Sequence, residues 1–317
     1  MRRKLRDFRE IPAKLAAAEP RLVARRPFRM HSLSQQLILW RRDFHAHPEL
    51  GLREYRTAAR ICDVLSQLPG CSLRVGAEAL SADARTGAPS AAECAAAREE
   101  AIAAGANPRW VNALGDGLTA VMAEWTFPRP GPTVAFRVDI DALPVTETTA
   151  ATHRPARDGY VSHQLGRMHA CGHDGHTSIG LGLASIVHER ATRENWGGRL
   201  RLIFQPAEEG CSGAAPMVAA GAVEGVDYFI AGHLGISAGE TGMVSCGTEG
   251  FLATTKFDVV LRGVAAHAGI KPHIGRNALL AAASLTLQLH AISRHGDGDS
   301  RVNVGVVHAG SGRNVIA

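Results

Sequence analysis

The sequence lacks the features of a membrane protein, of a disulfide-stapled secreted protein and of a chain with a secretory signal. No apolar run approaches the roughly 18 residues that are needed to span a bilayer. The six cysteines are scattered, and none of them forms a CxxC pair or any other part of a disulfide framework. The basic N-terminus has no apolar core of the kind that a secretory signal carries. We therefore expect a cytoplasmic protein with reduced thiols and no membrane partner.

Aromatic residues are also scarce, at 5% of 317 positions, so the core must rest on Leu, Val, Ile and Ala. Apolar residues make up 45% of the chain and charged residues 21%, which is an ordinary globular balance. This balance excludes a disordered or fibrous chain. The length is about right for two domains.

The net charge of +5 does not indicate a nucleic-acid-binding surface, because the excess lies in one short segment. Residues 1–29 hold ten Lys and Arg against three acidic residues, whereas the remainder holds 25 basic and 27 acidic residues. We expect residues 1–29 to be a disordered basic extension. Met30 is an alternative start, in which case the segment is translated upstream sequence.

Helices and strands are predicted to alternate along the chain. Hydrophobic spacing and turn residues predict helices at residues 34–46 (with Ser34 as the cap), 53–68, 91–104, 176–190, 213–221 and 277–295. Alternating or continuous apolar runs predict strands at residues 118–125, 133–139, 199–205, 227–233, 254–263 and 301–310, with a turn at 129–132. This order predicts an α/β sheet with helices on both faces over residues 30–248, followed by a partial α+β domain over residues 249–317.

The densest group of metal-binding side chains is His169-Ala-Cys171-Gly-His173-Asp174-Gly-His176. It lies between irregular chain and a predicted helix, so that its side chains can converge at the start of the helix. Cys171 and His173 are two residues apart and can point to the same side of an extended loop. A thiolate and an imidazole together suit Zn²⁺ and neighbouring metals. A loop that merely happens to be rich in histidine is the alternative, and the density of the cluster argues against it.

Further polar residues stand directly after predicted strands. Glu208 and Glu209 follow one buried strand, His233 ends another, and Asp139 and Asp141 end a third. Ligands bind at the carboxyl ends of strands in open α/β sheets. One glutamate can therefore hold a metal while the other moves protons, and the aspartates can orient the metal-binding imidazoles from behind.

These residues lie in motifs that closely resemble the metal-dependent amidohydrolases of the aminoacylase/carboxypeptidase superfamily. The motifs occupy residues 137–144, 169–177, 204–210, 267–279 and 310–315. The Cys-Gly-His variant resembles the branch that contains the auxin-conjugate amidohydrolases. Within that branch, residues 40–49, 74–126, 151–160 and 300–315 are similar to enzymes that hydrolyse the amide between p-aminobenzoate and glutamate.

The resemblance implies a mixed-sheet dinuclear metallohydrolase domain followed by an incomplete α+β lid and dimerisation domain. It implies two divalent metal ions, Mn²⁺ in preference to Zn²⁺, held by a set of four residues with Cys171 as the bridging ligand. The implied ligands are Cys171, His173, Glu209 and His233. Glu208 would be the general base, and His176 would support the helix start from behind the metal ligands.

The resemblance also assigns roles to the second domain. His267 would polarise the scissile carbonyl in the active site of a partner subunit, while Asn303 and Arg313 would hold a substrate carboxylate. The partner would be a homologous second subunit, or a second copy paired through the lid. The family draws one more histidine ligand from a segment beyond the last residue of this sequence, so the resemblance implies a C-terminally truncated chain.

Three alternatives remain open from the sequence. The first is a homodimeric amidohydrolase that acts on a broader range of N-acyl amino acids. The second is a metal-binding or regulatory subunit without catalytic activity, against which the presence of Glu208 argues. The third is nucleic-acid binding through residues 1–29, which would require salt-sensitive affinity that disappears when this segment is deleted.

Overall fold

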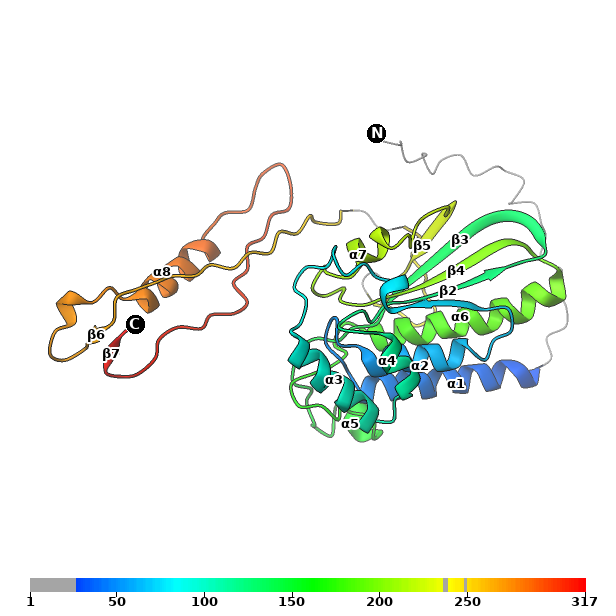
Figure 1. The fold of residues 1–317 in the computed structure, drawn as a ribbon, viewed down its shortest axis with the longest axis horizontal. Coiled ribbons are helices and arrows are strands. Elements are labelled where there is room, and N and C mark those ends of the chain that lie inside the picture. Colours follow the sequence, from blue (N-terminus) through cyan, green and yellow to red (C-terminus); the bar gives the residue numbers. More distant parts are fainter. Residues whose placement is uncertain (1–26, 236–238, 248–249) are drawn as a thin grey trace. The chain divides into compact units, whose positions relative to one another are not determined.

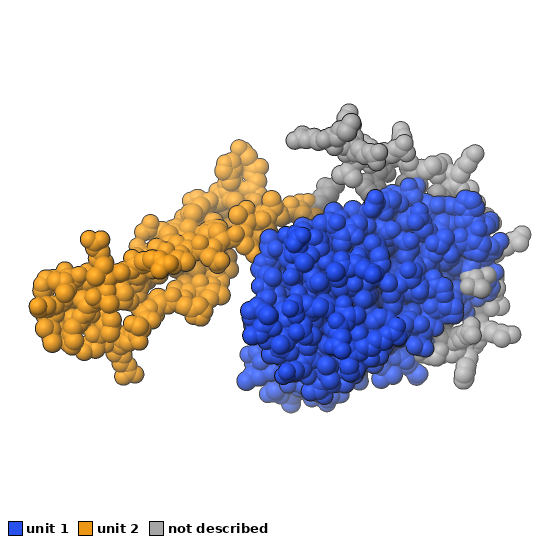
Figure 2. All heavy atoms as spheres, in the orientation of Figure 1, with its two compact units in different colours: residues 1–236 blue, residues 237–317 orange. Residues whose placement is uncertain are grey.

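The computed structural model describes residues 27–235, 239–247 and 250–317. The expected basic extension lies outside the described residues, apart from its last three positions. The chain divides into two compact units, residues 1–236 and residues 237–317 (Figure 2). Each unit is described by itself below.

Among its described residues, unit 1 contains a five-stranded mixed sheet with the order β1-β2-β4-β3-β5 (Figure 1). The strands β1 and β4 both run antiparallel to β2, whereas β3 runs parallel to its neighbours β4 and β5. The α/β class and the mixed sheet predicted from the sequence are confirmed. The strands are β1 (Ser72–Val75), β2 (Val121–Thr126), β3 (Arg129–Asp139), β4 (Gly197–Gln205) and β5 (Tyr228–Ala231).

The helices of unit 1 are α1 (Pro27–Ala46), α2 (Tyr55–Leu65), α3 (Ala91–Ala103), α4 (Pro108–Ala113), α5 (Arg154–Arg157), α6 (His173–Glu194) and α7 (Ala214–Ala219). In Figure 1, α1, α2 and α6 gather on one face of the sheet, where α6 packs against β3 and β4 and α1 packs against α6. No helix among the described residues is long and apolar enough to cross a membrane.

The two faces of the sheet are built by side chains that alternate along each strand. On β4, Leu200, Leu202 and Phe204 belong to the main buried cluster beneath α2 and α6, whereas Ile203 belongs to a second cluster that includes Met217 of α7. Helices therefore contribute to both faces. The main cluster is mostly aliphatic, as the low aromatic content predicts.

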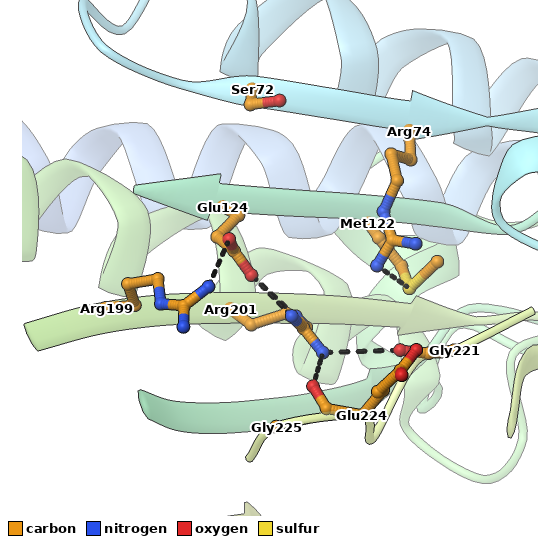
Figure 3. Close-up of a pocket in the computed structure, with 9 residues that line it drawn as sticks. All are labelled: Ser72, Arg74, Met122, Glu124, Arg199, Arg201, Gly221, Glu224 and Gly225. Carbon is orange, nitrogen blue, oxygen red and sulfur yellow. Dashed lines mark hydrogen bonds and ion pairs between the residues drawn. The ribbon is translucent and has the colours of Figure 1, made fainter. Parts of the chain in front are cut away.

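The second face is polar near β1 and the start of β4, and it holds a hollow of about 450 Å³ (Figure 3). Arg201 spans its floor, donating to Glu124 Oε2 at 2.7 Å and to the carbonyl oxygens of Ala222 and Glu224 at 3.0 and 2.9 Å. The guanidinium of Arg74 donates to the carbonyl of Ala220 at 3.3 Å. The hollow is lined by Ser72, Arg74, Met122, Glu124, Arg199, Arg201, Gly221, Glu224 and Gly225.

Several predicted boundaries are wrong by a few residues. The helix α1 begins at Pro27, so Ser34 lies inside it and does not cap it; proline suits a first helical position because its missing N–H would be unsatisfied there. The helix α6 begins at His173, three residues before the predicted start at His176. The predicted turn at residues 129–132 is part of β3, which accommodates it through a shift of register.

Unit 2 contains the helix α8 (Ala278–His290) and two short antiparallel strands, β6 (Ala266–His267) and β7 (Val315–Ile316). The strands predicted at residues 254–263 and 301–310 are absent from the described residues. A strand is stable only when its backbone pairs with a neighbour and one face is covered. Here the apolar side chains stay in solvent, as in Val260, which is 74% exposed.

Candidate metal centre

The carboxyl ends of three parallel strands bring the predicted site residues of unit 1 together. Asp141 lies two residues beyond β3, Glu208 and Glu209 follow β4, and His233 lies two residues beyond β5. Because β4, β3 and β5 are parallel neighbours, these segments leave the sheet at the same edge. The first turn of α6 reaches the same place, since His173 contacts residues of all three segments.

His173 is oriented by Asp141 so that one ring nitrogen is left for a cation. Its Nδ1 lies 3.2 Å from Asp141 Oδ1, and the ring is fully buried. The buried Nε2 makes no hydrogen bond to any residue that the structure describes, although oxygens of Asp139, Glu208 and Glu209 lie 3.6 to 3.9 Å away. A carboxylate behind a histidine is the arrangement that fixes metal-binding imidazoles.

Cys171 and His233 complete one group of possible ligands. The Sγ atom of Cys171 lies 3.4 Å from His233 Nε2, and His233 Nδ1 donates to the carbonyl of Leu234 at 2.8 Å. This second bond turns His233 Nε2 toward the thiol. The ligand atoms of Cys171, His173 and His233 lie within 4.8 Å of one another, and so do those of His173, Glu208 and Glu209.

His176 supports this arrangement from behind. Its Nδ1 lies 2.5 Å from Asp139 Oδ1, and its Nε2 accepts a hydrogen bond at 2.9 Å from the backbone N–H of Leu234. Both ring nitrogens are therefore used by the protein. His176 fixes the residue that follows His233, and Asp139 fixes His176 in turn.

The paired glutamates leave β4 through a tight turn at Ala207. This residue has a φ of +49°, a left-handed conformation that costs a residue with a Cβ about 1 kcal/mol. The backbone N–H of Glu209 donates to Asp141 Oδ2 at 3.1 Å, and that of Cys211 donates to the carbonyl of Glu208 at 2.7 Å. The turn presents both carboxylates to His173.

The pKa shifts show that the site carries an excess of negative charge. Burial opposes protonation of His173, but its bond to Asp141 and the charges of Asp139, Asp141 and Glu209 raise its pKa to about 9. Burial, with a contribution from Glu209, raises the pKa of the Cys171 thiol to about 12. Burial and repulsion from neighbouring carboxylates also raise the pKa of Glu209. A divalent cation would offset this charge and would ionise the thiol, so the residues fit a metal.

A second polar cluster lies behind the loop that carries Cys171 and His173. His45 of α1 bridges two buried carboxylates, with Nδ1 at 2.8 Å from Asp174 Oδ2 and Nε2 at 2.9 Å from Glu147 Oε1. Burial opposes protonation of His45, but its bonds to Asp174 and Glu147 raise its pKa. Arg41 also donates to Asp174, at 2.8 Å. The sequence analysis missed His45 and Glu147, because nothing in the spacing of residues so far apart links them.

Replacing His45 by glutamine is expected to lower the free energy of unfolding by about 3 kcal/mol, since it leaves a buried carboxylate without its cationic partner. Urea unfolding at pH 7 measures the change. His153→Gln is the matched control, because His153 contacts the same Glu147 oxygen at 2.6 Å but is partly exposed. An equal loss in both variants would contradict the role given to His45.

His169, which is buried, is expected to make the fold sensitive to acid. Burial lowers its pKa from 6.5 to about 4, and neither ring nitrogen has a hydrogen-bond partner among the described residues. Below pH 6.5 the unfolded chain therefore binds a proton that the folded chain does not, so stability falls from pH 6.5 toward pH 4. His169→Phe should flatten this decline by up to ~1.4 kcal/mol per pH unit. Urea unfolding of the metal-free protein between pH 4.5 and 6.5 tests this, with His188→Phe as the control.

The other predicted site residues belong to unit 2. His267 Nδ1 accepts hydrogen bonds from the backbone N–H groups of Gly269 and Ile270 at 3.1 and 3.0 Å, and its Nε2 lies 2.9 Å from Asn314 Nδ2. Asn303 and Arg313 are exposed. The structure brings none of these three into a cluster of possible metal ligands.

The fold and the ligand cluster agree with the comparison with known families. Residues 135–310 match the model of peptidase family M20/M25/M40, and the chain belongs to this family. The resemblance to metal-dependent amidohydrolases inferred from the motifs is thereby confirmed.

Individual relatives narrow the comparison. The chain is 51% identical to indole-3-acetyl-aspartic acid hydrolase from Enterobacter agglomerans and 50% identical to one named subunit of p-aminobenzoyl-glutamate hydrolase from Escherichia coli K12, in each case over 90% of its own length. It is 47% identical, with a TM-score of 0.70 over 91% of its length, to the crystal structure of an aminobenzoyl-glutamate utilization protein from Klebsiella pneumoniae. The chain spans 65% of the length of each of these three relatives.

Proposed function

We propose that this chain belongs to a metal-dependent amidohydrolase that cleaves p-aminobenzoyl-glutamate into p-aminobenzoate and glutamate. The observation that carries the proposal is the meeting of Cys171, His173, Glu209 and His233 beside Glu208. The substrate rests on the similarity to relatives named for it.

Two divalent metal ions would be held by Cys171, His173, Glu209 and His233. Thiolate, imidazole and carboxylate ligands accept both Mn²⁺ and Zn²⁺, and the resemblance of the motifs favours Mn²⁺. When bound, such ions lower the pKa of water and polarise a carbonyl oxygen. Metal analysis of the purified protein tests the number and the identity of the ions.

The residues of the chain then divide the work of hydrolysis. Glu208, which is partly exposed, takes a proton from the water as the water oxygen adds to the carbonyl carbon. It returns this proton to the amine of glutamate as the C–N bond breaks. His267 of a second protomer would donate to the developing oxyanion, while Asn303 and Arg313 would hold a carboxylate of the glutamate.

We propose that the partner is a homologous second subunit, with a homodimer formed through residues 249–317 as the alternative. One relative is named as one subunit of its enzyme, which supports a heteromeric assembly. The six cysteines are free, as expected in the cytoplasm. Light scattering of the chain alone and together with a co-expressed homologous subunit distinguishes the two assemblies.

A second substrate class is supported by the relative that is named as a hydrolase of indole-3-acetyl-aspartic acid. The test compares release of p-aminobenzoate with release of indole-3-acetate and of acetate from N-acetyl amino acids, using protein loaded with Mn²⁺ or Zn²⁺. The highest kcat/KM for p-aminobenzoyl-glutamate supports the first proposal, and the highest value for the indole conjugate replaces it. Bound metal without hydrolysis of any of the three indicates a non-catalytic subunit.

A further inference from the structure

Glu54 is a buried carboxyl group that the proposed mechanism does not use. It stands immediately before α2, is fully buried, and makes no side-chain bond to the N-terminus of that helix. Glu49 serves the helix instead, because its two oxygens each accept a backbone N–H at 2.8 Å, from Arg56 and Thr57. The side chain of Glu54 is therefore directed elsewhere.

Its two oxygens reach across unit 1 to the turn that carries the paired glutamates. Oε1 accepts a hydrogen bond at 2.8 Å from the backbone N–H of Ala207, which is 153 positions further along the chain. Oε2 lies 2.5 Å from the hydroxyl of Thr119, which is also buried. Glu54 is thus held at one end by Thr119 and holds Ala207 at the other.

Ala207 is the point at which the turn needs support. Its φ of +49° is unfavourable for alanine, and the next two residues are Glu208 and Glu209. Gly51 packs directly against it, since a Cβ on Gly51 would lie 3.0 Å from the Cβ of Ala207. The segment around Glu54 thus supports the turn both by a hydrogen bond and by contact.

We propose that Glu54 is a positioning residue that holds Ala207 in its left-handed conformation and thereby aims Glu208 and Glu209 at the metal centre. The catalytic part of this inference rests on the proposed function. The positioning part does not, because it concerns the backbone of the turn and the binding of metal by Glu209.

The ionisation state of Glu54 suggests an informative variant. Burial, reinforced by the charge of Asp141, raises its pKa to about 8. At pH 7 the neutral acid can accept from Ala207 through one oxygen and donate to Thr119 through the other. Glutamine reproduces both contacts, since its carbonyl oxygen accepts and its amide nitrogen donates.

The experiment compares Glu54→Gln, Glu54→Ala and the double variant Glu54→Ala/Ala207→Gly with the wild type. Hydrogen exchange of the 206–210 segment and the Kd for Mn²⁺ and Zn²⁺ report on the turn without any substrate. Glu54→Gln should match the wild type in both. Glu54→Ala should exchange faster and bind metal about 10–100-fold more weakly, as expected when support behind a ligand is removed. Leu65→Ala is the control, because it destabilises the other end of α2 without touching the turn.

The double variant separates positioning from general stability. Glycine adopts a positive φ without strain, so Ala207→Gly should restore part of the metal affinity that Glu54→Ala loses. If the enzyme hydrolyses p-aminobenzoyl-glutamate, Glu54→Ala should lower kcat with little change in KM, and the double variant should recover part of it.

Unchanged exchange and metal affinity in Glu54→Ala would overturn the proposal, as would a loss in Leu65→Ala equal to that in Glu54→Ala. If Glu54→Ala does not fold, loss of protection or of metal affinity in folded Glu54→Gln would overturn it equally. A wild type that binds metal but hydrolyses nothing would count against the proposed function alone, because the exchange and metal readouts still decide the role of Glu54.

Discussion

Replacing Glu208 by glutamine is expected to abolish most of the hydrolytic activity while leaving the metal in place. Glutamine has the shape of glutamate but cannot accept a proton from water at neutral pH. General bases typically contribute 10²–10⁴-fold to a rate, so kcat should fall by at least ~100-fold. Metal binding should persist, because the proposed ligands Cys171, His173, Glu209 and His233 are untouched.

The measurement combines steady-state hydrolysis of p-aminobenzoyl-glutamate with metal analysis of the same sample. Glu99→Gln is the matched control, because it makes the same chemical change at an exposed position on α3. A variant at Glu208 with full metal content and a near-normal kcat would remove Glu208 from the role of base. Loss of metal together with activity would make it a ligand instead.

Replacing Cys171 by serine is expected to reduce metal binding before any question of turnover arises. A hydroxyl ionises less readily than a thiol and is a poorer ligand for Zn²⁺ and similar ions. The acidic surroundings already hold the pKa of the thiol at about 12, so only a metal can ionise it at neutral pH. Changes behind a ligand cost 10–100-fold in affinity, and loss of the ligand itself should cost at least ~100-fold.

Titration with Mn²⁺ and Zn²⁺, followed by metal analysis after dialysis, measures this effect. Cys246→Ser is the control, since Cys246 is exposed and lies outside the cluster. Unchanged occupancy and Kd in Cys171→Ser would show that the thiol is not a ligand. The two serine variants also separate metal loss from any general sensitivity of the protein to losing a thiol.

Strand-end reasoning from the sequence predicted which polar residues of unit 1 would meet. Asp141, Glu209 and His233 follow three apolar runs, and parallel strands necessarily end at one edge of a sheet. The Cys171–His173 motif could be placed at a helix start because the apolar periodicity begins just after it. These signals are local, and therefore they can be read from residues close together in the chain.

Other features depend on contacts between residues that are far apart, and the sequence could not supply them. The bridge from His45 to Glu147 spans 102 positions, and the bond from Ala207 to Glu54 spans 153. The strands predicted at residues 254–263 and 301–310 failed for the same reason, since alternation of apolar residues describes a surface that could be covered but does not provide the neighbour that covers it.

The sequence by itself determined the set of donor atoms and the edge of the sheet at which they gather. Only the tertiary structure decided what each imidazole does there. His173 and His176 lie three residues apart on one helix, yet Asp141 orients the first and leaves its Nε2 facing the carboxylates, while Asp139 and the N–H of Leu234 occupy both nitrogens of the second. The physical reason is that the ligand role of a histidine is set by the partner of its other nitrogen, and that partner is provided by a different strand.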